Sequence, residues 1–269
     1  MAVTLRWRAL APFGAEIERD LDEPFGPSEA YHFRELLKEH GLLLMRGQRL
    51  SMQRQRGICA MIGPILLRAG EGETMTNEGG GPAASELTWH ADAAYTEHPF
   101  EALSLHALDV VDGASSTRFV HAGDAWDRLP ADLREHLAGR AQAMVSPHYS
   151  RLAARTCDQP QGDALVRATR PTVLRHPATG RDCLWVSELQ TAGLIGMDET
   201  ESRSILHRVF AALYAQDAVF EHRWRTGDLI VWDNIALQHS RGNLAGVGRR
   251  VLQRVIVGSE GVAPHVAAG

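Results

Sequence analysis

Two side chains that commonly bind metals lie two residues apart within the strand-like segment 87–95. They are His90 and Asp92. Positions i and i+2 of an extended strand point to the same face, so the imidazole and the carboxylate can meet at one point. Such a pair supplies two of the three ligands of the two-histidine, one-carboxylate site that holds non-haem Fe(II) and leaves coordination positions open. A chain with 13 histidines also places such pairs on solvated strands by chance, so a third ligand must decide.

A candidate for the third ligand lies in the last third of the chain. Residues 227–240 predict a strand that runs into a corner at Asp233 and Asn234 and then returns to His239. Small and polar residues flank this histidine. The segment can therefore bring a second imidazole back to the pair described above.

Two arginines on the next predicted strand, residues 250–257, share one face. Arg250 and Arg254 have the same parity, whereas Arg249 has the opposite parity and is expected to be solvated. Guanidinium groups on the inward face of an apolar strand are unfavourable unless anions meet them. We therefore expect an anion-binding face here. The alternative is a pair of outward-facing arginines.

The composition limits the classes of function. Hydrophobic residues make up 44% and charged residues 23% of the 269 residues, as in a soluble globular protein, and residues 1–269 are expected to form one domain. A net charge of −5 gives no basic field for nucleic acid or an anionic membrane surface. Three widely spaced cysteines without a CxxC pair predict neither a disulfide framework nor a thiolate zinc site. No signal peptide or membrane-spanning run is recognisable, so the sequence predicts a cytoplasmic protein.

Helices are expected on both sides of a short buried strand near the N-terminus. The first covers residues 28–40, with Ser28 as its cap and Gly41 at its end, and the second covers 51–62. The unbroken apolar run 42–45 between them predicts the buried strand.

Strands dominate the remainder of the chain. They are expected at 100–108, 117–120, 170–174, 183–186, 219–225, 229–232 and 251–257. Helical patterns cover 124–137, broken at Pro130, and 198–215, capped by Asp198. This order predicts a mainly β fold with flanking helices, built on a jelly-roll or barrel. A glycine-rich phosphate loop and a Gly-x-Ser-x-Gly elbow are both missing from the sequence, which argues against nucleotide-binding and hydrolase folds.

Two further segments stand apart from this pattern. Residues 69–86 are rich in glycine and polar groups, and we interpret them as either an active-site lid or a plain surface loop. Residues 259–269 are expected to form a flexible tail.

Taken in chain order, these features resemble the taurine dioxygenase family of Fe(II)- and 2-oxoglutarate-dependent oxygenases. The resemblance spans roughly residues 15–257. It is carried by His90-x-Asp92, the Trp232-Asp233-Asn234 corner, His239, Arg250, the strand at 42–48 and the hairpin at 175–181.

The resemblance implies a double-stranded β-helix, a cupin-like jelly-roll, in which His90, Asp92 and His239 bind iron. It implies that Arg250 pairs with the distal carboxylate of 2-oxoglutarate, for which a guanidinium fork is well suited. Thr117 matches the family's threonine for the same carboxylate, although Ala114-Ser115-Ser116 replaces the Gly-Gly-Asp that precedes it.

Substrate contacts are implied for Arg254, Glu86, Gln190 and Tyr95. Arg254 matches an arginine that faces the sulfonate in the taurine enzyme. Gln190 stands where that enzyme has an aromatic side chain, and together with the glycine-rich 69–86 loop this departure puts taurine itself in doubt.

The implied reaction is hydroxylation of an unactivated C–H bond in a small carboxylate or sulfonate, with O2 consumed and 2-oxoglutarate converted to succinate and CO2. Desaturation or fragmentation stays open, whereas halogenation is not expected because Asp92 occupies the position that a halide would need. The family also implies a homodimer or homotetramer. Two other classes remain: a metal-binding jelly-roll with non-redox chemistry, and a catalytically silent sensor. The first of these classes would not need Arg250 or 2-oxoglutarate.

Overall fold

The structure of the chain is a computed structural model that describes residues 4–67, 73–78, 84–146 and 166–259. The tail predicted to be flexible lies outside these residues except for Ser259. Parts of the loop predicted at 69–86 also lie outside them, and its described part includes a short strand at Thr74–Thr76. The lid interpretation stays a prediction.

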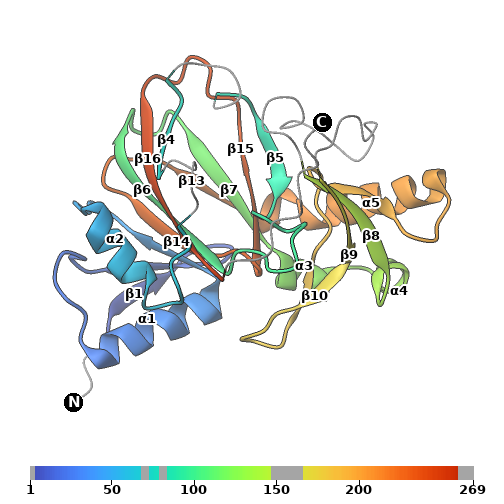
Figure 1. Ribbon diagram of the computed structural model, residues 1–269, viewed down its shortest axis with the longest axis horizontal. Helices are drawn as coiled ribbons and strands as arrows, with labels where there is room; N and C mark the ends of the chain where they lie inside the picture. The colour runs from blue at the N-terminus through green and yellow to red at the C-terminus, as the bar shows by residue number, and fades with distance from the viewer. Residues whose placement is uncertain (1–3, 68–72, 79–83, 147–165, 260–269) are drawn as a thin grey trace.

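Two β-sheets form the centre of the molecule (Figure 1). Their strands are β1 (Arg6–Ala9), β2 (Ala15–Glu18), β3 (Leu42–Met45), β4 (Thr74–Thr76), β5 (Leu87–His90), β6 (Ala102–Val110), β7 (Ser116–His121), β13 (Val219–Arg223), β14 (Leu229–Asp233), β15 (Leu237–Arg241) and β16 (Arg250–Val257). The larger sheet has the order β1-β2-β3-β14-β6-β16-β4, and the smaller has the order β13-β7-β15-β5. Phe119 from the smaller sheet and Trp232 and Leu252 from the larger belong to one buried cluster. The sheets therefore pack face to face, and the predicted mainly β fold is confirmed.

The middle of the larger sheet is buried on both faces. β14 pairs antiparallel with β3 on one side and with β6 on the other. Leu42 and Leu44 of β3 join the cluster between the sheets, whereas Leu43 and Met45 join a second cluster under the N-terminal helices. Alternate residues thus enter two different cores, which explains why the run 42–45 is apolar without interruption.

The first helix, α1, spans Pro27–His40 and ends at Gly41 as predicted, with Gly41 in the left-handed conformation at φ 71°. The prediction that Ser28 caps the helix is wrong. Gly26 is the N-cap, and Glu29 accepts a hydrogen bond from its backbone N–H at 2.9 Å. Proline is favoured at the first helical position, so Pro27 begins the helix and the cap lies two residues earlier than predicted.

The second helix, α2, spans Met52–Cys59 and begins at the predicted cap, Ser51, which accepts from Arg54 N. The predicted end at residue 62 is wrong, because residues 60–62 form turns. These turns place Ile62 against the cluster that contains Cys59 and Val255.

A second group of elements covers the other face of the smaller sheet (Figure 1). It comprises α3 (Ala122–Arg128), α4 (Ala131–Leu137), α5 (Glu199–Leu213), β8 (Ala141–Ser146), β9 (Val166–Pro171), β10 (Val173–Arg175), β11 (Asp182–Leu184) and β12 (Thr191–Leu194). The predicted break at Pro130 and the predicted cap at Asp198 are both confirmed. The strand expected at 170–174 is divided at Thr172 between β9, which pairs with β8, and β10, which pairs with β11.

None of the helices in the described ranges is long and apolar enough to cross a membrane. Cys59 and Cys183 are buried free thiols, and burial raises the pKa of each to about 12. Cys157 lies outside the described residues.

Candidate metal centre and cosubstrate site

The two predicted histidine ligands are direct partners across two neighbouring strands. His90 ends β5, and His239 lies in the middle of β15 opposite it. Directly paired residues in an antiparallel ladder project to the same face, so the two rings lie 4.2 Å apart between centroids. Strand pairing thus brings together two residues that are far apart in the sequence.

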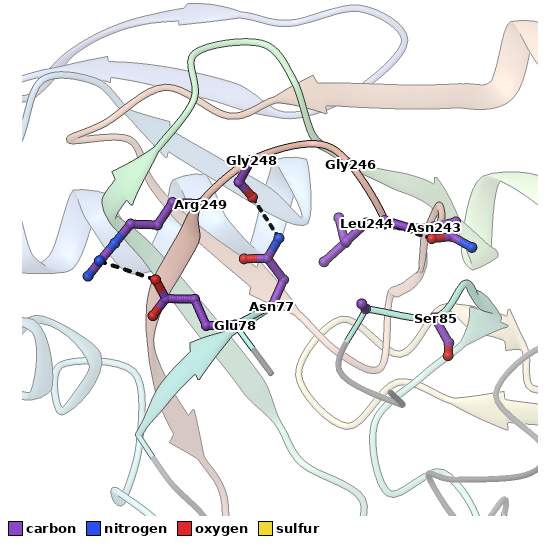
Figure 2. Close-up of a pocket in the computed structure, with 10 residues that line it drawn as sticks. Asn77, Glu78, Ser85, Asn243, Leu244, Gly246, Gly248 and Arg249 are labelled. Atoms are coloured by element: carbon purple, nitrogen blue, oxygen red, sulfur yellow. Dashed lines mark hydrogen bonds and ion pairs between the residues drawn. The ribbon is translucent and has the colours of Figure 1, made fainter. Parts of the chain in front are cut away.

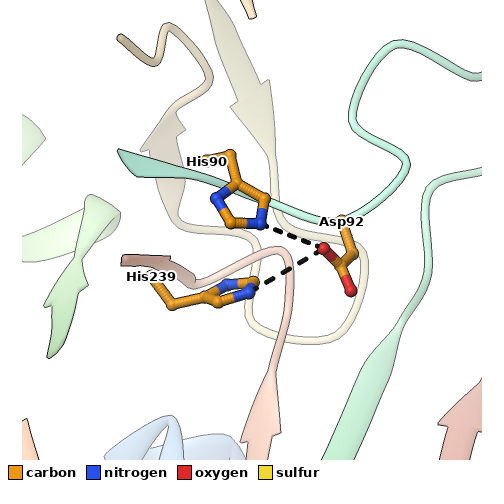
Figure 3. A group of neighbouring side chains, drawn as sticks. All are labelled: His90, Asp92 and His239. Atoms are coloured by element: carbon orange, nitrogen blue, oxygen red, sulfur yellow. Dashed lines mark ion pairs between the residues drawn. The ribbon is translucent and has the colours of Figure 1, made fainter. Parts of the chain in front are cut away.

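Asp92 completes the group just beyond the end of β5 (Figure 3). Its Oδ1 lies 3.2 Å from His90 Nε2 and 3.8 Å from His239 Nε2. One ligand atom from each of the three residues lies within 4.8 Å of the others. The three ligands predicted from the sequence therefore converge in the structure.

The protonation states at this centre suit a divalent cation. Nδ1 of His90 lies 2.8 Å from the Thr88 carbonyl and donates to it, which leaves the lone pair of Nε2 facing Asp92. Burial, with the neighbouring His90, lowers the pKa of His239 to about 3, so its imidazole is neutral at pH 7. Burial alone would raise the pKa of Asp92, but the nearby His90, His239 and Arg254 outweigh it and hold that pKa well below its usual range. One carboxylate and two neutral imidazoles with converging lone pairs are the ligand states that Fe(II) requires.

Asn234 holds Asp92 in place. Its Oδ1 accepts from Asp92 N at 3.0 Å, and its Nδ2 donates to the carbonyls of Asp92 at 2.9 Å and Phe100 at 3.0 Å. The side chain is fully buried. The next residue, Ala93, has a φ of 57°, a conformation that a non-glycine residue adopts only when its surroundings impose it. The Asn234 amide supplies part of that constraint.

Gln190 fixes the residue between the two ligands on the 90–92 segment. Its Nε2 donates to the Ala91 carbonyl at 2.9 Å, and its Oε1 accepts from the Ser187 hydroxyl at 3.1 Å. Both polar groups of this buried amide are therefore used by the protein itself. A substrate contact from Gln190 stays a prediction.

The corner before His239 is anchored by a histidine from the hairpin at 175–181. Asp233 Oδ2 accepts from His176 Nε2 at 2.8 Å, and its Oδ1 accepts from the backbone N–H groups of Ile235 and Ala236, both at 2.9 Å. The hairpin that carried part of the family resemblance thus fixes the turn into β15.

Arg250 faces the space between the sheets, as its parity predicted. Leu252 of the same face belongs to the inter-sheet cluster, whereas Gln253 of the other face donates to Gln55 of α2. Arg250 is only 4% exposed, yet its Nε has no hydrogen-bond partner within the described ranges. Burial and the nearby Arg241 lower the pKa of Arg250 to about 9. A buried guanidinium whose Nε lacks a partner fits an incoming carboxylate, such as that of 2-oxoglutarate.

Arg249 lies on the outer side, as predicted. It is exposed and forms ion pairs with Glu78 at 3.2 Å and with Asp109 at 2.8 Å. The two adjacent arginines therefore have opposite surroundings.

Thr117 lies on β7, two residues before Phe119, which pairs with His239. Thr117 is buried, and its hydroxyl oxygen accepts from Trp224 Nε1 at 3.0 Å. A hydroxyl that accepts in this way still has its own proton to donate. The position therefore allows the expected contact with the cosubstrate.

The other predicted substrate contacts are more scattered. Arg254 is partly buried, and its charge contributes to the low pKa of Asp92. Glu86 is exposed, and Tyr95 is partly buried against the cluster that contains Trp185. Their roles towards a substrate stay predictions.

A hollow of about 600 Å³ opens where β16 begins (Figure 2). Asn77 lines it and ties β4 to β16: its Nδ2 donates to the Gly248 carbonyl at 2.7 Å, and its Oδ1 accepts from Arg250 N at 2.9 Å.

The sequence did not indicate this role of Asn77, because nothing local distinguishes Asn77 from a loop asparagine. The Asn234 contact was missed in the same way, although Asn234 had been noted as part of a corner.

The model of the family described as "Taurine catabolism dioxygenase TauD, TfdA family" matches residues 6–256. The chain belongs to this family. The resemblance stated from the sequence is therefore confirmed, and so is the prediction of an oxidoreductase of the dioxygenase class.

Members of the TauD/TfdA family that resemble this chain differ in what their names say they do. "Alpha-ketoglutarate-dependent 2,4-dichlorophenoxyacetate dioxygenase" from Cupriavidus pinatubonensis is 26% identical, over 90% of this chain and 93% of its own. "Pentalenolactone F synthase" from Streptomyces avermitilis is 24% identical, over 64% of this chain and 61% of its own. Alpha-ketoglutarate is 2-oxoglutarate, so the name of the first relative agrees with the expected cosubstrate.

The crystal structure of a taurine dioxygenase from Burkholderia xenovorans superposes on this chain with a TM-score of 0.79 at 21% identity. The match covers 97% of this chain and 93% of that one. The jelly-roll fold predicted from the sequence is thereby confirmed.

Proposed function

We propose that this TauD/TfdA family member is an Fe(II)- and 2-oxoglutarate-dependent dioxygenase that hydroxylates a C–H bond of a small carboxylate or sulfonate. The observation that carries the proposal is one arrangement on the inner face of the sandwich. Two imidazoles and a carboxylate converge, and the buried Arg250 on a neighbouring sheet has a guanidinium Nε without a partner in the described ranges.

His90, Asp92 and His239 would hold Fe(II), and Arg250 with Thr117 would hold the distal carboxylate of 2-oxoglutarate. When bound, the metal and cosubstrate supply O2 activation, in which 2-oxoglutarate becomes succinate and CO2 and one oxygen atom enters the substrate.

The chain's own contribution is to orient these groups and exclude water. Thr88 and Asn234 hold His90 and Asp92 in the orientations described above. The rings of Trp232 and Phe119 pack against His239, with centroids 5.2 Å and 6.1 Å away. This apolar backing keeps solvent from one side of the ligand and limits side reactions of the bound cosubstrate.

We assign the acid group of the primary substrate to Arg254, with Glu86, Gln190 and Tyr95 as further candidate contacts. Arg254 shares the inward face of β16 with Arg250, and its positive charge is felt at Asp92. The name of the Cupriavidus relative supports an acidic substrate, because 2,4-dichlorophenoxyacetate carries a carboxylate.

The same proposal includes a cytoplasmic protein without a nucleic-acid partner, organised as a single domain over 1–269 and assembled as a homodimer or homotetramer. A net charge of −5 supports the absence of a nucleic-acid partner.

Succinate production tests the proposal. Purified protein with Fe(II), 2-oxoglutarate and O2 is incubated with a panel of small carboxylates and sulfonates, each matched to its uncharged amide or alcohol. We expect substrate-stimulated succinate with the acids and little with the uncharged partners. His239→Ala should abolish it, whereas His98→Ala, a change at an exposed histidine, should not.

Two results would replace the proposal. Metal binding without 2-oxoglutarate binding, measured anaerobically, would indicate a metal jelly-roll with non-redox chemistry. Binding of both without succinate formation for any compound would favour a sensor role.

A further inference from the structure

Arg241 is a charged side chain next to the site to which the family resemblance gives no role. It lies on β15 two positions after His239 and so projects to the same face. β15 pairs with β7 so that His239 lies opposite Phe119 and Ser240 opposite Arg118. The pairing ends at Ser240, and the same register continued by one residue would bring Arg241 opposite Thr117, the residue assigned to the cosubstrate carboxylate.

The charge of Arg241 is not neutralised by the described part of the chain. Its guanidinium is partly buried, and its hydrogen bond is to the adjacent Gly242 carbonyl, at a long 3.4 Å. No carboxylate of the described ranges lies within ion-pair distance of it. Arg249, by contrast, contacts two carboxylates on the outer surface.

Arg241 ends β15 and Arg250 begins β16, so the two arginines lie at the same end of the sandwich, each on the inward face of its strand. In keeping with this placement, burial lowers the pKa of Arg250, and the charge of Arg241 lowers it further. Two like charges held close together in a partly buried place are unfavourable unless one anion meets both.

We propose that Arg241 is a second guanidinium for the distal carboxylate of 2-oxoglutarate, acting together with Arg250. This inference rests on the function proposed above. A carboxylate has two oxygens and about four acceptor sites, so it can accept from two guanidinium groups and the Thr117 hydroxyl together. The second cation would also relieve the repulsion, because the bound anion lies between the two positive charges.

Anaerobic titration of the Fe(II) protein tests this assignment without turnover. The charge-transfer absorption that accompanies chelation is followed with 2-oxoglutarate and with 2-oxopentanoate, which has the same carbon chain but no distal carboxylate. We expect Arg241→Gln to raise the Kd for 2-oxoglutarate by about tenfold or more, and the Kd for 2-oxopentanoate by no more than about twofold. Arg241→Lys keeps the charge but loses the fork, and should give an intermediate Kd for 2-oxoglutarate.

The matched control is Arg249→Gln, which removes a guanidinium from the outer surface nearby and should leave both Kd values unchanged. The inference is overturned if Arg241→Gln binds 2-oxoglutarate as the parent protein does, or if both keto acids weaken equally, which would indicate general distortion. If Arg241→Gln does not fold, the test uses Arg241→Lys, and an unchanged Kd for 2-oxoglutarate in that variant also overturns the inference. If the parent protein itself gives no absorption change with either keto acid, the proposed function fails and this inference falls with it.

Discussion

Asn234 pairs its side-chain amide with the main chain of Asp92 in both directions. The carboxamide oxygen accepts from Asp92 N at 3.0 Å, and the carboxamide nitrogen donates to Asp92 O at 2.9 Å, across a sequence separation of 142 residues. The corner after β14 therefore sets the position of the carboxylate ligand, and the same corner leads to His239 on β15. Asn234 thus fixes the position of the ligand Asp92 relative to the ligand His239.

Replacement of Asn234 by alanine should weaken both the fold and the metal site. The change leaves the Asp92 N–H and two carbonyls without their buried partner, so we expect a loss of about 3 kcal/mol in the free energy of unfolding of the metal-free protein. Metal affinity should fall roughly tenfold to a hundredfold, as for other residues that orient a ligand. Urea unfolding and Co(II) titration measure the two effects. Asn243→Ala, at an exposed asparagine, should change neither, and an unaltered Co(II) affinity in Asn234→Ala would contradict the assigned role.

Replacement of Asn77 by alanine should act on the cosubstrate. Asn77 holds the backbone at Arg250, so its loss should raise the KM for 2-oxoglutarate roughly threefold to tenfold and leave kcat within about twofold. Initial rates at saturating substrate and varied 2-oxoglutarate measure this. Asn243→Ala is again the comparison, because Asn243 lines the same hollow but, among the described residues, its side chain bonds only to Ala245 N. An equal fall in kcat with unchanged KM would argue against a positioning role for Asn77.

The buried His239 should make the metal-free protein less stable as the pH falls. Its pKa is lowered to about 3 in the folded protein, because of burial and the nearby His90, whereas it is about 6.5 in an unfolded chain. Between these values the unfolded state binds a proton that the folded state does not. Stability is therefore full above about pH 6.5 and declines below it, by at most about 1.4 kcal/mol per pH unit for this group.

Urea unfolding of the metal-free protein at pH 7, 6 and 5 measures this decline. His239→Gln lacks the titrating group, so its stability should fall less over the same range. Parallel curves for the two proteins would show that His239 does not contribute.

Arg254→Ala should separate the substrate from the cosubstrate. If Arg254 meets the acid group of the primary substrate, its loss should reduce substrate-stimulated succinate formation by about tenfold or more while the Kd for 2-oxoglutarate stays within about twofold. Anaerobic titration and the succinate assay are compared on the same preparation. A large rise in the Kd for 2-oxoglutarate would instead place Arg254 with Arg250 at the cosubstrate.

The sequence allowed prediction wherever a local pattern determines the structure. The run 42–45, the Asp198 cap, the break at Pro130 and the shared face of Arg250 and Leu252 each depend on nearby residues or on strand parity. The ligand set was within reach because His90 and Asp92 share a short segment. The Ser28 cap was wrong because a proline at the first helical position competes with a serine one residue later.

Contacts between distant segments could not be predicted in this way. Asn234 reaches Asp92 across 142 residues, and Asn77 reaches Arg250 N across 173. An asparagine in a loop has the same local signature whether it is solvated or bonded to a distant backbone. Arg241 is an intermediate case, because its parity with His239 is readable but its unbalanced charge becomes visible only in three dimensions.

The position of β5 at the edge of the smaller sheet affects how well the protein resists proteolysis in the cell. Among the strands that the structure describes, β5 pairs with one neighbour, β15, and the proposed ion would be held by residues of both segments. A ligand that binds only the closed form stabilises it in proportion to its concentration. Bound iron would therefore stabilise the pairing of β5 with β15 against local unfolding. Amide hydrogen exchange along β5 would be slower with iron than without it. Iron scarcity would then expose the protein to proteolysis as well as silence it.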